Sequence, residues 1–476
     1  MSEEGDSPPL VIVGGGLAGL AATVGLAERG LKIELYEAHR RLGGRATSFF
    51  DSASGEWIDH CQHVGMGCCT NLSDFCRRTG LAEHFRRDRV LRFFGPDGRC
   101  HRLTASRGWP APAHLAPSLW QLKYLSVAER IGIGRAMLHL ARSRPNDDDS
   151  LTVGAWLHRE RQSPRAIDLF WSVVLVSALG EELDRASLVH ARKVFVDGFL
   201  AAREAYEIDV PCAPLNELYG KRLQAWLEDR GIRLRLGCEV RRIGGNPGGV
   251  THVELADGSQ RPVAGAIVAV TWRRVRGLFE KDVLERLPEL SQVDQIDGAP
   301  ITGVHLWFDR PITSLPHAVL VGRLSQWMFN RGTQASERSS EAGPFYYQVV
   351  ISASRSLAGR DRESVVAEIV DDLAGIWPAA RDAKLIRWRM VTEPSAVFSV
   401  RPGIERIRPP QRTSIPNLAL AGDWTRTGWP STMEGAVRSG YLAAEVILRS
   451  LGREERLLVP DLKPAFWAKL LVGASR

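Results

Sequence analysis

Apolar residues near the start of the chain are arranged as a strand, a helix and a second strand. Residues 10–13 (Leu-Val-Ile-Val) form a continuous apolar run, which is typical of a parallel strand buried on both faces. Residues 17–28 predict a helix that stops at Gly30, and residues 31–36 alternate as a strand that ends on Glu37. This order predicts a βαβ unit.

A similar pattern returns later in the chain. Residues 215–229 predict a helix, and residues 231–236 and 238–243 predict strands. A hairpin is expected around Asp257-Gly258, followed by an apolar strand at 266–270.

The end of the chain carries one more strand and helix. Residues 417–421 form a short apolar strand, which ends at Gly422-Asp423, and residues 435–448 predict a helix with one apolar face. Ser431 and Glu434 have the spacing of a capping box, with Ser431 as the N-cap.

The turn after the first strand has the pattern G-x-G-x-x-G. Gly14 permits the tight turn, Gly16 lets a pyrophosphate approach the backbone, and Gly19 lets helix and strand pack closely. The helix N-terminus offers N–H groups to the anion. Glu37 follows roughly 20 residues later and can accept hydrogen bonds from a ribose. Strand, glycines, helix, strand and acid in this order predict a dinucleotide site.

Residues 37–45 extend the motif beyond what NAD-binding units need. The sequence Glu37-Ala38, followed by Leu42-Gly43-Gly44-Arg45, resembles the Glu-Ala…Gly-Gly-Arg stretch of the flavin amine oxidase and phytoene desaturase superfamily. The resemblance implies that the cofactor is FAD. It also implies that Val240 lies beside the adenine, that Asp423 binds the ribityl chain, and that the helix after Thr432 stabilises negative charge on reduced flavin. Motif and resemblance together give these cofactor-binding residues: Gly14, Gly15, Gly16, Leu17, Ala18, Gly19, Glu37, Ala38, Gly43, Gly44, Arg45, Val240, Gly422, Asp423, Thr432 and Met433.

The expected fold class is α/β, with an FAD-binding Rossmann-type (glutathione-reductase-like) domain and an interleaved α+β substrate domain. The flavin domain takes residues 1–75, 206–290 and 406–450. The substrate domain takes residues 76–205 and 291–405. Residues 451–476 form a C-terminal tail.

Residues 56–80, 171–188 and 422–440 are similar to hydroxysqualene dehydroxylases, the squalene-associated FAD enzymes of hopanoid biosynthesis. Cys61 stands where that family usually has Gly, and Trp429 replaces a smaller residue. The resemblance implies reductive removal of an allylic hydroxyl from a C30 isoprenoid, with hydride from reduced FAD. His63 is the candidate general acid for the leaving hydroxyl; the alternative, which we favour, is that His63 makes a structural hydrogen bond or orients the flavin ring.

Three other functions stay open at this point. A carotenoid or phytoene-type desaturase would move hydride from substrate to FAD. A flavin amine oxidase is less favoured, because such enzymes commonly carry an aromatic residue where Thr432 stands. A prenyl-lipid carrier without FAD would be expected to lose the phosphate-binding glycines, which this chain keeps.

Composition bears on where the protein is located and on whether it contacts a membrane. The chain has 476 residues, a net charge of +7 and seven cysteines, too few and odd in number for a disulfide framework. Acidic residues at the start and the lack of a long apolar run predict a cytoplasmic protein without a transmembrane helix. Aromatic and basic residues in the tail suit contact with the inner face of a membrane, or docking to a partner. The apolar segment 109–124 suits either membrane contact or packing in the core.

Two clusters are assigned no special chemistry. The first holds cysteines whose spacing does not suit a metal, so we expect buried side chains and no metal site: Cys61, Cys68, Cys69 and Cys76. The second is a set of arginines without a nucleic-acid reader motif, so a solvated basic face is expected and no nucleic-acid partner: Arg235, Arg241, Arg242, Arg273 and Arg274. Only one dinucleotide fingerprint is present, so no second domain for NAD(P)H is expected. The electron donor is unknown: it must either bind transiently or be a different electron carrier.

Overall fold

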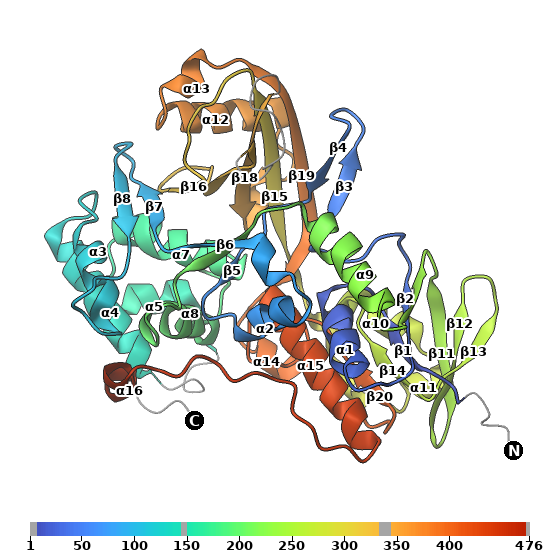
Figure 1. Cartoon of the computed structure of the whole chain (residues 1–476). Helices are drawn as coiled ribbons and strands as arrows, with labels where there is room; N and C mark the ends of the chain where they lie inside the picture. Colours follow the sequence, from blue (N-terminus) through green and yellow to red (C-terminus); the bar gives the residue numbers. More distant parts are fainter. Residues whose placement is uncertain (1–6, 144–149, 333–343, 473–476) are drawn as a thin grey trace, which may run out of the picture.

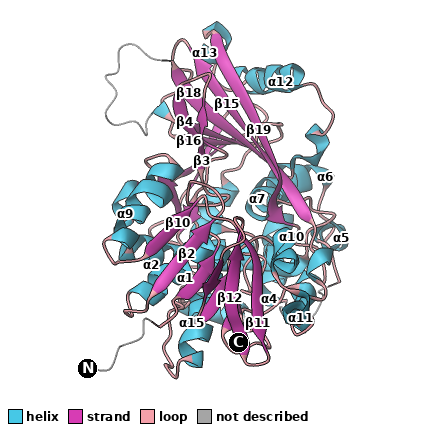
Figure 2. Ribbon diagram, turned by 90° about the vertical axis from the view of Figure 1, so that its right-hand side faces the viewer, coloured by secondary structure: helices cyan, strands magenta, loops and turns pink. Residues whose placement is uncertain are grey.

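A five-stranded parallel sheet forms the base of the molecule (Figures 1 and 2). The computed structural model describes residues 7–143, 150–332 and 344–472. The strands lie in the order β10-β2-β1-β14-β20, and all the pairs are parallel. They are β1 (Leu10–Val13), β2 (Ile33–Glu37), β10 (Arg233–Leu236), β14 (Gly265–Val268) and β20 (Leu418–Leu420). Stretches far apart in sequence thus meet in one sheet, and the predicted Rossmann-type fold is confirmed.

Two helices from opposite ends of the chain cover one face of this sheet. α1 (Leu17–Ala27) packs lengthwise on α15 (Met433–Ser450) (Figure 1). Contact is so close at Gly440 that a Cβ there would lie 2.2 Å from the carbonyl oxygen of Ala18. The absence of a side chain at Gly440 therefore lets the last helix dock on the first.

A seven-stranded sheet stands above the parallel sheet in Figure 1. Its strand order is β19-β15-β18-β17-β16-β7-β8. The strands are β7 (Leu91–Phe94), β8 (Cys100–Leu103), β15 (Gly298–Phe308), β16 (His317–Leu320), β17 (Trp327–Asn330), β18 (Phe345–Ser352) and β19 (Leu385–Phe398). α12 (Arg362–Ala374) buries Val365, Ile369 and Leu373 against one face of this sheet.

A helical region lies beside both sheets, on the left of Figure 1. It contains α3 (Ala116–Trp120), α4 (Val127–Arg142), α5 (Val153–Arg159), α6 (Pro164–Ala166), α7 (Ser172–Leu179) and α8 (Leu188–Phe195). Two π-helical turns interrupt it: η3 (Ile167–Trp171) before α7 and η4 (Val196–Leu200) after α8. Thr152 caps α5 by accepting a hydrogen bond from the amide of Ala155.

Smaller elements complete the fold. The hairpin predicted at Asp257-Gly258 joins β12 (Gly249–Leu255) to β13 (Gln260–Pro262). The helix predicted at 215–229 begins as a π-helical segment, η5 (Asn216–Arg222), and continues as α9 (Leu223–Glu228). The remaining strands are β3 (Ser48–Asp51), β4 (Glu56–Asp59), β5 (Gly65–Met66), β6 (Phe85–Asp88), β9 (Ile208–Pro211) and β11 (Val240–Asn246). The remaining helices are α2 (Thr70–Arg78), α10 (Trp272–Val275), α11 (Lys281–Leu284), α13 (Ala379–Asp382) and α14 (Ile404–Ile407).

The C-terminal tail crosses from the parallel sheet to the helical region (Figure 1). Leu457 is buried against Gly25, and the amide of Ala465 donates to the carbonyl of Ala201 at 2.8 Å. The chain then forms α16 (Phe466–Val472), which packs against α4. In the described part of the chain, no helix combines the length and hydropathy that a membrane crossing requires.

Candidate cofactor and substrate cavity

The glycine turn after β1 leaves its backbone open to a ligand. Gly14 has φ +110°, and a Cβ there would lie 2.6 Å from the carbonyl oxygen of Ala269, so this position requires glycine. A Cβ at Gly16 would meet nothing closer than the Cα of Gly44, at 3.9 Å. Gly16 therefore faces free space at the N-terminus of α1, as a cradle for a pyrophosphate requires.

The second glycine pair lies directly against this turn. The amide of Gly43 donates to the carbonyl of Gly15 at 2.8 Å, and Gly43 pairs with Gly16 in a parallel bridge. A Cβ at Gly44 would come within 3.0 Å of the Cα of Gly16. Two glycine turns thus form one continuous backbone surface.

Glu37 closes the far side of the turn. Its Oε2 accepts a hydrogen bond from the amide of Gly15 at 2.7 Å, and its Oε1 accepts one from the amide of His39 at 2.8 Å. The carboxylate is thereby fixed at the end of β2, where each oxygen keeps a further lone pair for a ribose hydroxyl.

The N-terminus of α15 is capped differently from the prediction. Thr432, not Ser431, is the N-cap, and its Oγ1 accepts from the amide of Gly435 at 3.0 Å. Ser431 instead donates its hydroxyl to the carboxylate of Asp423. The other carboxylate oxygen of Asp423 pairs with Arg45, so the predicted residues Arg45 and Asp423 meet across the chain.

Glu434 also departs from the predicted capping box. Its carboxylate accepts hydrogen bonds from the amides of Asn71, at 3.2 Å, and Leu72, at 2.7 Å. These amides open α2, so Glu434 caps another helix and ties α15 to it. Burial raises the pKa of Glu434, and the hydrogen bonds from α2 and the charge of Arg438 act in the opposite direction.

One cavity of about 1020 Å³ joins these elements. Gly15 and Gly19 do not line it: Gly15 braces Glu37, and a Cβ at Gly19 would lie 1.9 Å from the carbonyl oxygen of Gly14. The predicted residues that do line it are Gly14, Gly16, Leu17, Ala18, Glu37, Ala38, Gly43, Gly44, Arg45, His63, Val240, Gly422, Asp423, Thr432 and Met433. The cavity therefore reaches from the glycine turns to the N-terminus of α15.

Several basic residues of the cavity wall were not predicted. Arg41, Arg241, Arg273 and Arg274 line it. The last three are exposed, as expected for a solvated basic face, and their place at the cavity is what the sequence did not predict. Arg235 is also half exposed, at the sheet edge, and does not line the cavity. Arg273 and Arg274 follow the carboxyl end of β14 by a few residues, at the edge where ligands of open α/β sheets bind. Their position just after a predicted parallel strand could have identified Arg273 and Arg274 as cavity residues from the sequence.

His63 enters the cavity on a loop that is held from behind. Arg331 pairs with Asp59 at 2.6 Å and also donates to the side chain of Gln62. The amide of Leu215 donates to Asp59 at 2.9 Å. These buried contacts fix the residues on either side of Cys61, so that His63 has a defined position.

The protonation of His63 follows from its surroundings. Its Nδ1 lies 2.9 Å from the carbonyl oxygen of Cys61, and a carbonyl can only accept, so Nδ1 carries the proton. Burial lowers the pKa of His63 below 6.5, against a smaller raising effect of that hydrogen bond. At neutral pH the ring is uncharged and Nε2 presents a lone pair. Burial also raises the pKa of the Cys61 thiol to about 12, which keeps it protonated.

The opposite end of the cavity is apolar. Aliphatic side chains from α7, β15, β18 and β19 form its wall: Leu179, Ile301, Val350, Val391 and Val397. Glu393 and Ser352 add polar groups at this end. Cys61 and Trp429, the two departures from the hydroxysqualene dehydroxylase pattern, both line the cavity, so they shape the space beside the cofactor site. Cys68, Cys69 and Cys76 are buried.

Residues 17–448 match the family model of flavin-containing amine oxidoreductases. The chain belongs to this family. The open cradle at Gly16, the fixed Glu37 and the Arg45–Asp423 pair fit FAD, and the protein is an FAD-dependent oxidoreductase.

Curated relatives are similar over nearly the whole chain. The hydroxysqualene dehydroxylase of Sinorhizobium fredii is 28% identical, over 92% of this chain and 97% of the relative. The 15-cis-phytoene desaturase of Solanum lycopersicum is 25% identical, over 94% of this chain and 80% of the relative. Among solved structures, cyclohexylamine oxidase from Brevibacterium oxydans has a TM-score of 0.69 at 18% identity, covering 94% of this chain and all of that one. This last likeness concerns the fold.

Proposed function

We propose that the protein removes the hydroxyl group of hydroxysqualene and replaces it with hydrogen, giving squalene. The observation that carries the proposal is the apolar end of the cavity, where an aliphatic wall is interrupted by only a few polar side chains, among them His60, His63 and Glu393. Such a wall suits a hydrocarbon that carries one polar group. The similarity to a hydroxysqualene dehydroxylase over most of both chains supports the same substrate.

In this reaction the C–O bond of the alcohol breaks and a C–H bond forms with hydride. The hydroxyl group takes up a proton and leaves as water. Reduced FAD, when bound, supplies the hydride. The amides at the N-terminus of α15 lie at the cavity wall beside Thr432 and Met433, where they stabilise negative charge on the bound cofactor. Aliphatic residues exclude water and hold the chain.

His63 takes the orienting role in this proposal rather than that of the acid. Its uncharged Nε2 accepts a hydrogen bond from the substrate hydroxyl and so sets the position of the carbon that receives hydride. A resting imidazole with a lowered pKa has no proton on that atom to give. The proton for the leaving group therefore comes from another donor at the cavity.

Activity should accordingly decline in acid. Because the folded pKa of His63 lies below 6.5, the ring is uncharged at pH 7 to 8 and becomes protonated only as the pH falls through that lowered pKa. We expect constant kcat/KM above pH 7 and a fall on the acid side, which is absent in His63→Phe. That variant should keep its FAD absorbance and lose about tenfold in kcat/KM, the value of one hydrogen bond. A rate that increases in acid in the native protein alone would instead make His63 the acid.

A second candidate is a desaturase, in which hydride passes from substrate to oxidised FAD. Two observations favour it: phytoene desaturases are nearly as similar in sequence, and an uncharged Nε2 suits accepting a proton. One experiment distinguishes hydride transfer from FAD to the substrate from hydride transfer in the opposite direction. Anaerobic reduced protein is incubated with hydroxysqualene, and oxidised protein with phytoene, before lipid extraction. We expect squalene from the first; unchanged alcohol together with a desaturated carotene from the second would establish the alternative.

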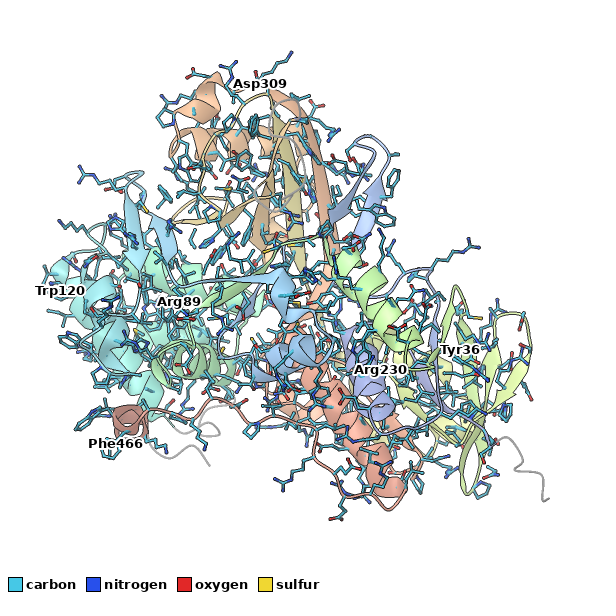
Figure 3. All side chains as sticks on the ribbon, viewed as in Figure 1. Tyr36, Arg89, Trp120, Arg230, Asp309 and Phe466 are labelled. Carbon is cyan, nitrogen blue, oxygen red and sulfur yellow. The ribbon has the colours of Figure 1, made fainter. Side chains whose placement is uncertain are left out.

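We further propose that α16 rests on a lipid surface, from which an isoprenoid is taken. Phe466, Trp467 and Leu470 are 67%, 55% and 65% exposed, beside Lys469. Figure 3 shows Phe466 at the same side of the molecule as Trp120, which is 52% exposed. Aromatic and basic residues together suit the interface of an anionic bilayer.

Serine at all three α16 positions should reduce binding to vesicles of phosphatidylglycerol and phosphatidylcholine by at least tenfold in a flotation assay, because most of the exposed apolar area of this helix is lost. Phe50→Ser with Ile386→Ser is the matched control, since these side chains are each 54% exposed on strands remote from α16 (Figure 1). Equal losses in both variants would argue against a specific membrane face.

A further inference from the structure

A second, smaller cavity lies in the helical region. Its volume is about 230 Å³, and it is lined by apolar side chains, by Gly134 and by one tyrosine, Tyr124. None of the residues that line it lines the cofactor cavity. It has no charged group, so neither a nucleotide nor an ionised metabolite suits it.

The two cavities share a wall. In α7, Val173 and Val174 face the small cavity, whereas Ser177 and Ala178 face the large one. The π-helical turn η4 also contributes to both cavities. Phe199 and Leu200 line the small cavity, and Asp197 and Gly198 line the large one. One layer of helix therefore separates this apolar chamber from the large cavity.

The outer edge of the small cavity is formed by the tail. Leu471 of α16 lines it, next to the exposed side chains of Phe466 and Leu470 on the same helix. α16 packs on α4, which contributes Met137 and Leu138 to the lining. The chamber thus lies between the exposed apolar face and the reaction cavity.

The lining indicates what the chamber can bind. Its volume of about 230 Å³ is bounded almost entirely by aliphatic and aromatic side chains, which favour a hydrocarbon over a polar ligand. The large cavity contains the cofactor site, so the chamber offers a hydrocarbon an apolar space that the cofactor does not occupy.

We propose that this chamber binds an apolar chain that enters beneath α16, at a site separate from the cavity where the reaction takes place. The inference rests on the proposed function for the identity of the chain as an isoprenoid. Binding itself depends only on the apolar lining and on access beneath α16.

Gly134 provides a variant that fills the chamber with little strain. A Cβ at Gly134 would meet nothing within 4 Å, and the residue lies inside α4. Gly134→Phe therefore places a ring at the lining without displacing backbone. Ala128→Phe adds the same ring to an exposed position of the same helix that lines neither cavity, and serves as the matched control.

The experiment is photocrosslinking of the FAD-loaded, full-length protein with a fifteen-carbon polyprenyl alcohol that carries a diazirine at its hydrocarbon end. We expect labelled peptides from residues 116–141, 169–174 and 195–200, at least a fivefold loss of this labelling in Gly134→Phe, and no loss in Ala128→Phe. Flavin absorbance and melting temperature establish that each variant is folded; Gly134→Leu is the substitute if the larger ring prevents folding.

Labelling confined to residues of the cofactor cavity, or equal labelling of Gly134→Phe and Ala128→Phe, would overturn the inference. The measurement does not involve turnover. If hydroxysqualene is not converted but the chamber is labelled as expected, the proposed function fails and the binding site stands.

Discussion

Gly16→Val is expected to give a folded protein that purifies without colour. Gly16 already has an extended backbone, at φ −75° and ψ 172°, which valine adopts readily. The nearest atom to an added Cβ is 3.9 Å away, so the fold has room for the side chain. The space that the side chain takes is the cradle of the pyrophosphate, and FAD affinity should fall at least 100-fold, equivalent to about 3 kcal/mol.

The measurement is flavin absorbance per protein after purification, followed by titration with FAD. Gly108→Val is the control, because a Cβ at Gly108 also meets nothing within 4 Å and Gly108 lies outside the cofactor cavity. Retention of full FAD content in Gly16→Val would place the phosphates elsewhere. A loss shared with Gly108→Val would point to a general defect of folding.

Glu434→Ala should be the most destabilising single change in the site. The carboxylate is fully buried and accepts from two backbone amides of α2, from the side chain of Asn71, and from Arg438. Alanine leaves those amides and the Arg438 guanidinium without this acceptor. We expect a loss of about 3 to 5 kcal/mol in the free energy of unfolding.

Denaturant unfolding of the FAD-loaded protein measures this loss. Glu434→Gln keeps an acceptor oxygen of the same size and should recover part of the stability. Glu445→Ala is a useful comparison, since Glu445 lies on the same helix and accepts from the amides of Leu457 and Leu458 in the tail. A loss in Glu434→Ala no greater than that in Glu445→Ala would show that the α2–α15 junction does not carry the stability assigned to it.

The elements around the cofactor could be predicted because local patterns specify them. Residues 10–13 are apolar throughout since both faces of β1 are covered, and Gly14 is fixed by a backbone conformation that other residues rarely adopt. Each of these constraints acts within a few residues. The strand, the turn and the helix therefore follow from sequence alone.

Contacts between distant residues set the parts that could not be predicted. Ser431 and Thr432 are both able to cap α15, and the pairing of Ser431 with Asp423 leaves the role to Thr432. Glu434 has the spacing of a local cap, but α2 offers it unpaired amides from a segment more than 300 residues away in the chain. Spacing along one helix carries no information about such a partner.

The arginines of the cavity show the same limit of local patterns. Arg241, Arg273 and Arg274 have no periodicity that distinguishes them from a solvated face. Only the packing of the β11-β12-β13 sheet beside the parallel sheet brings β11 and the end of β14 to one cavity. His63 was found by resemblance to a family. Its protonation depends on the carbonyl of Cys61 and on burial, neither of which a sequence shows.

A single-turnover experiment tests the central claim most directly. The FAD-loaded protein is reduced without oxygen and then mixed with hydroxysqualene, while flavin absorbance and squalene are measured in the same sample. The account predicts that the oxidised flavin spectrum returns and that one squalene forms for each flavin reoxidised. Flavin that stays reduced in the presence of intact hydroxysqualene would contradict it.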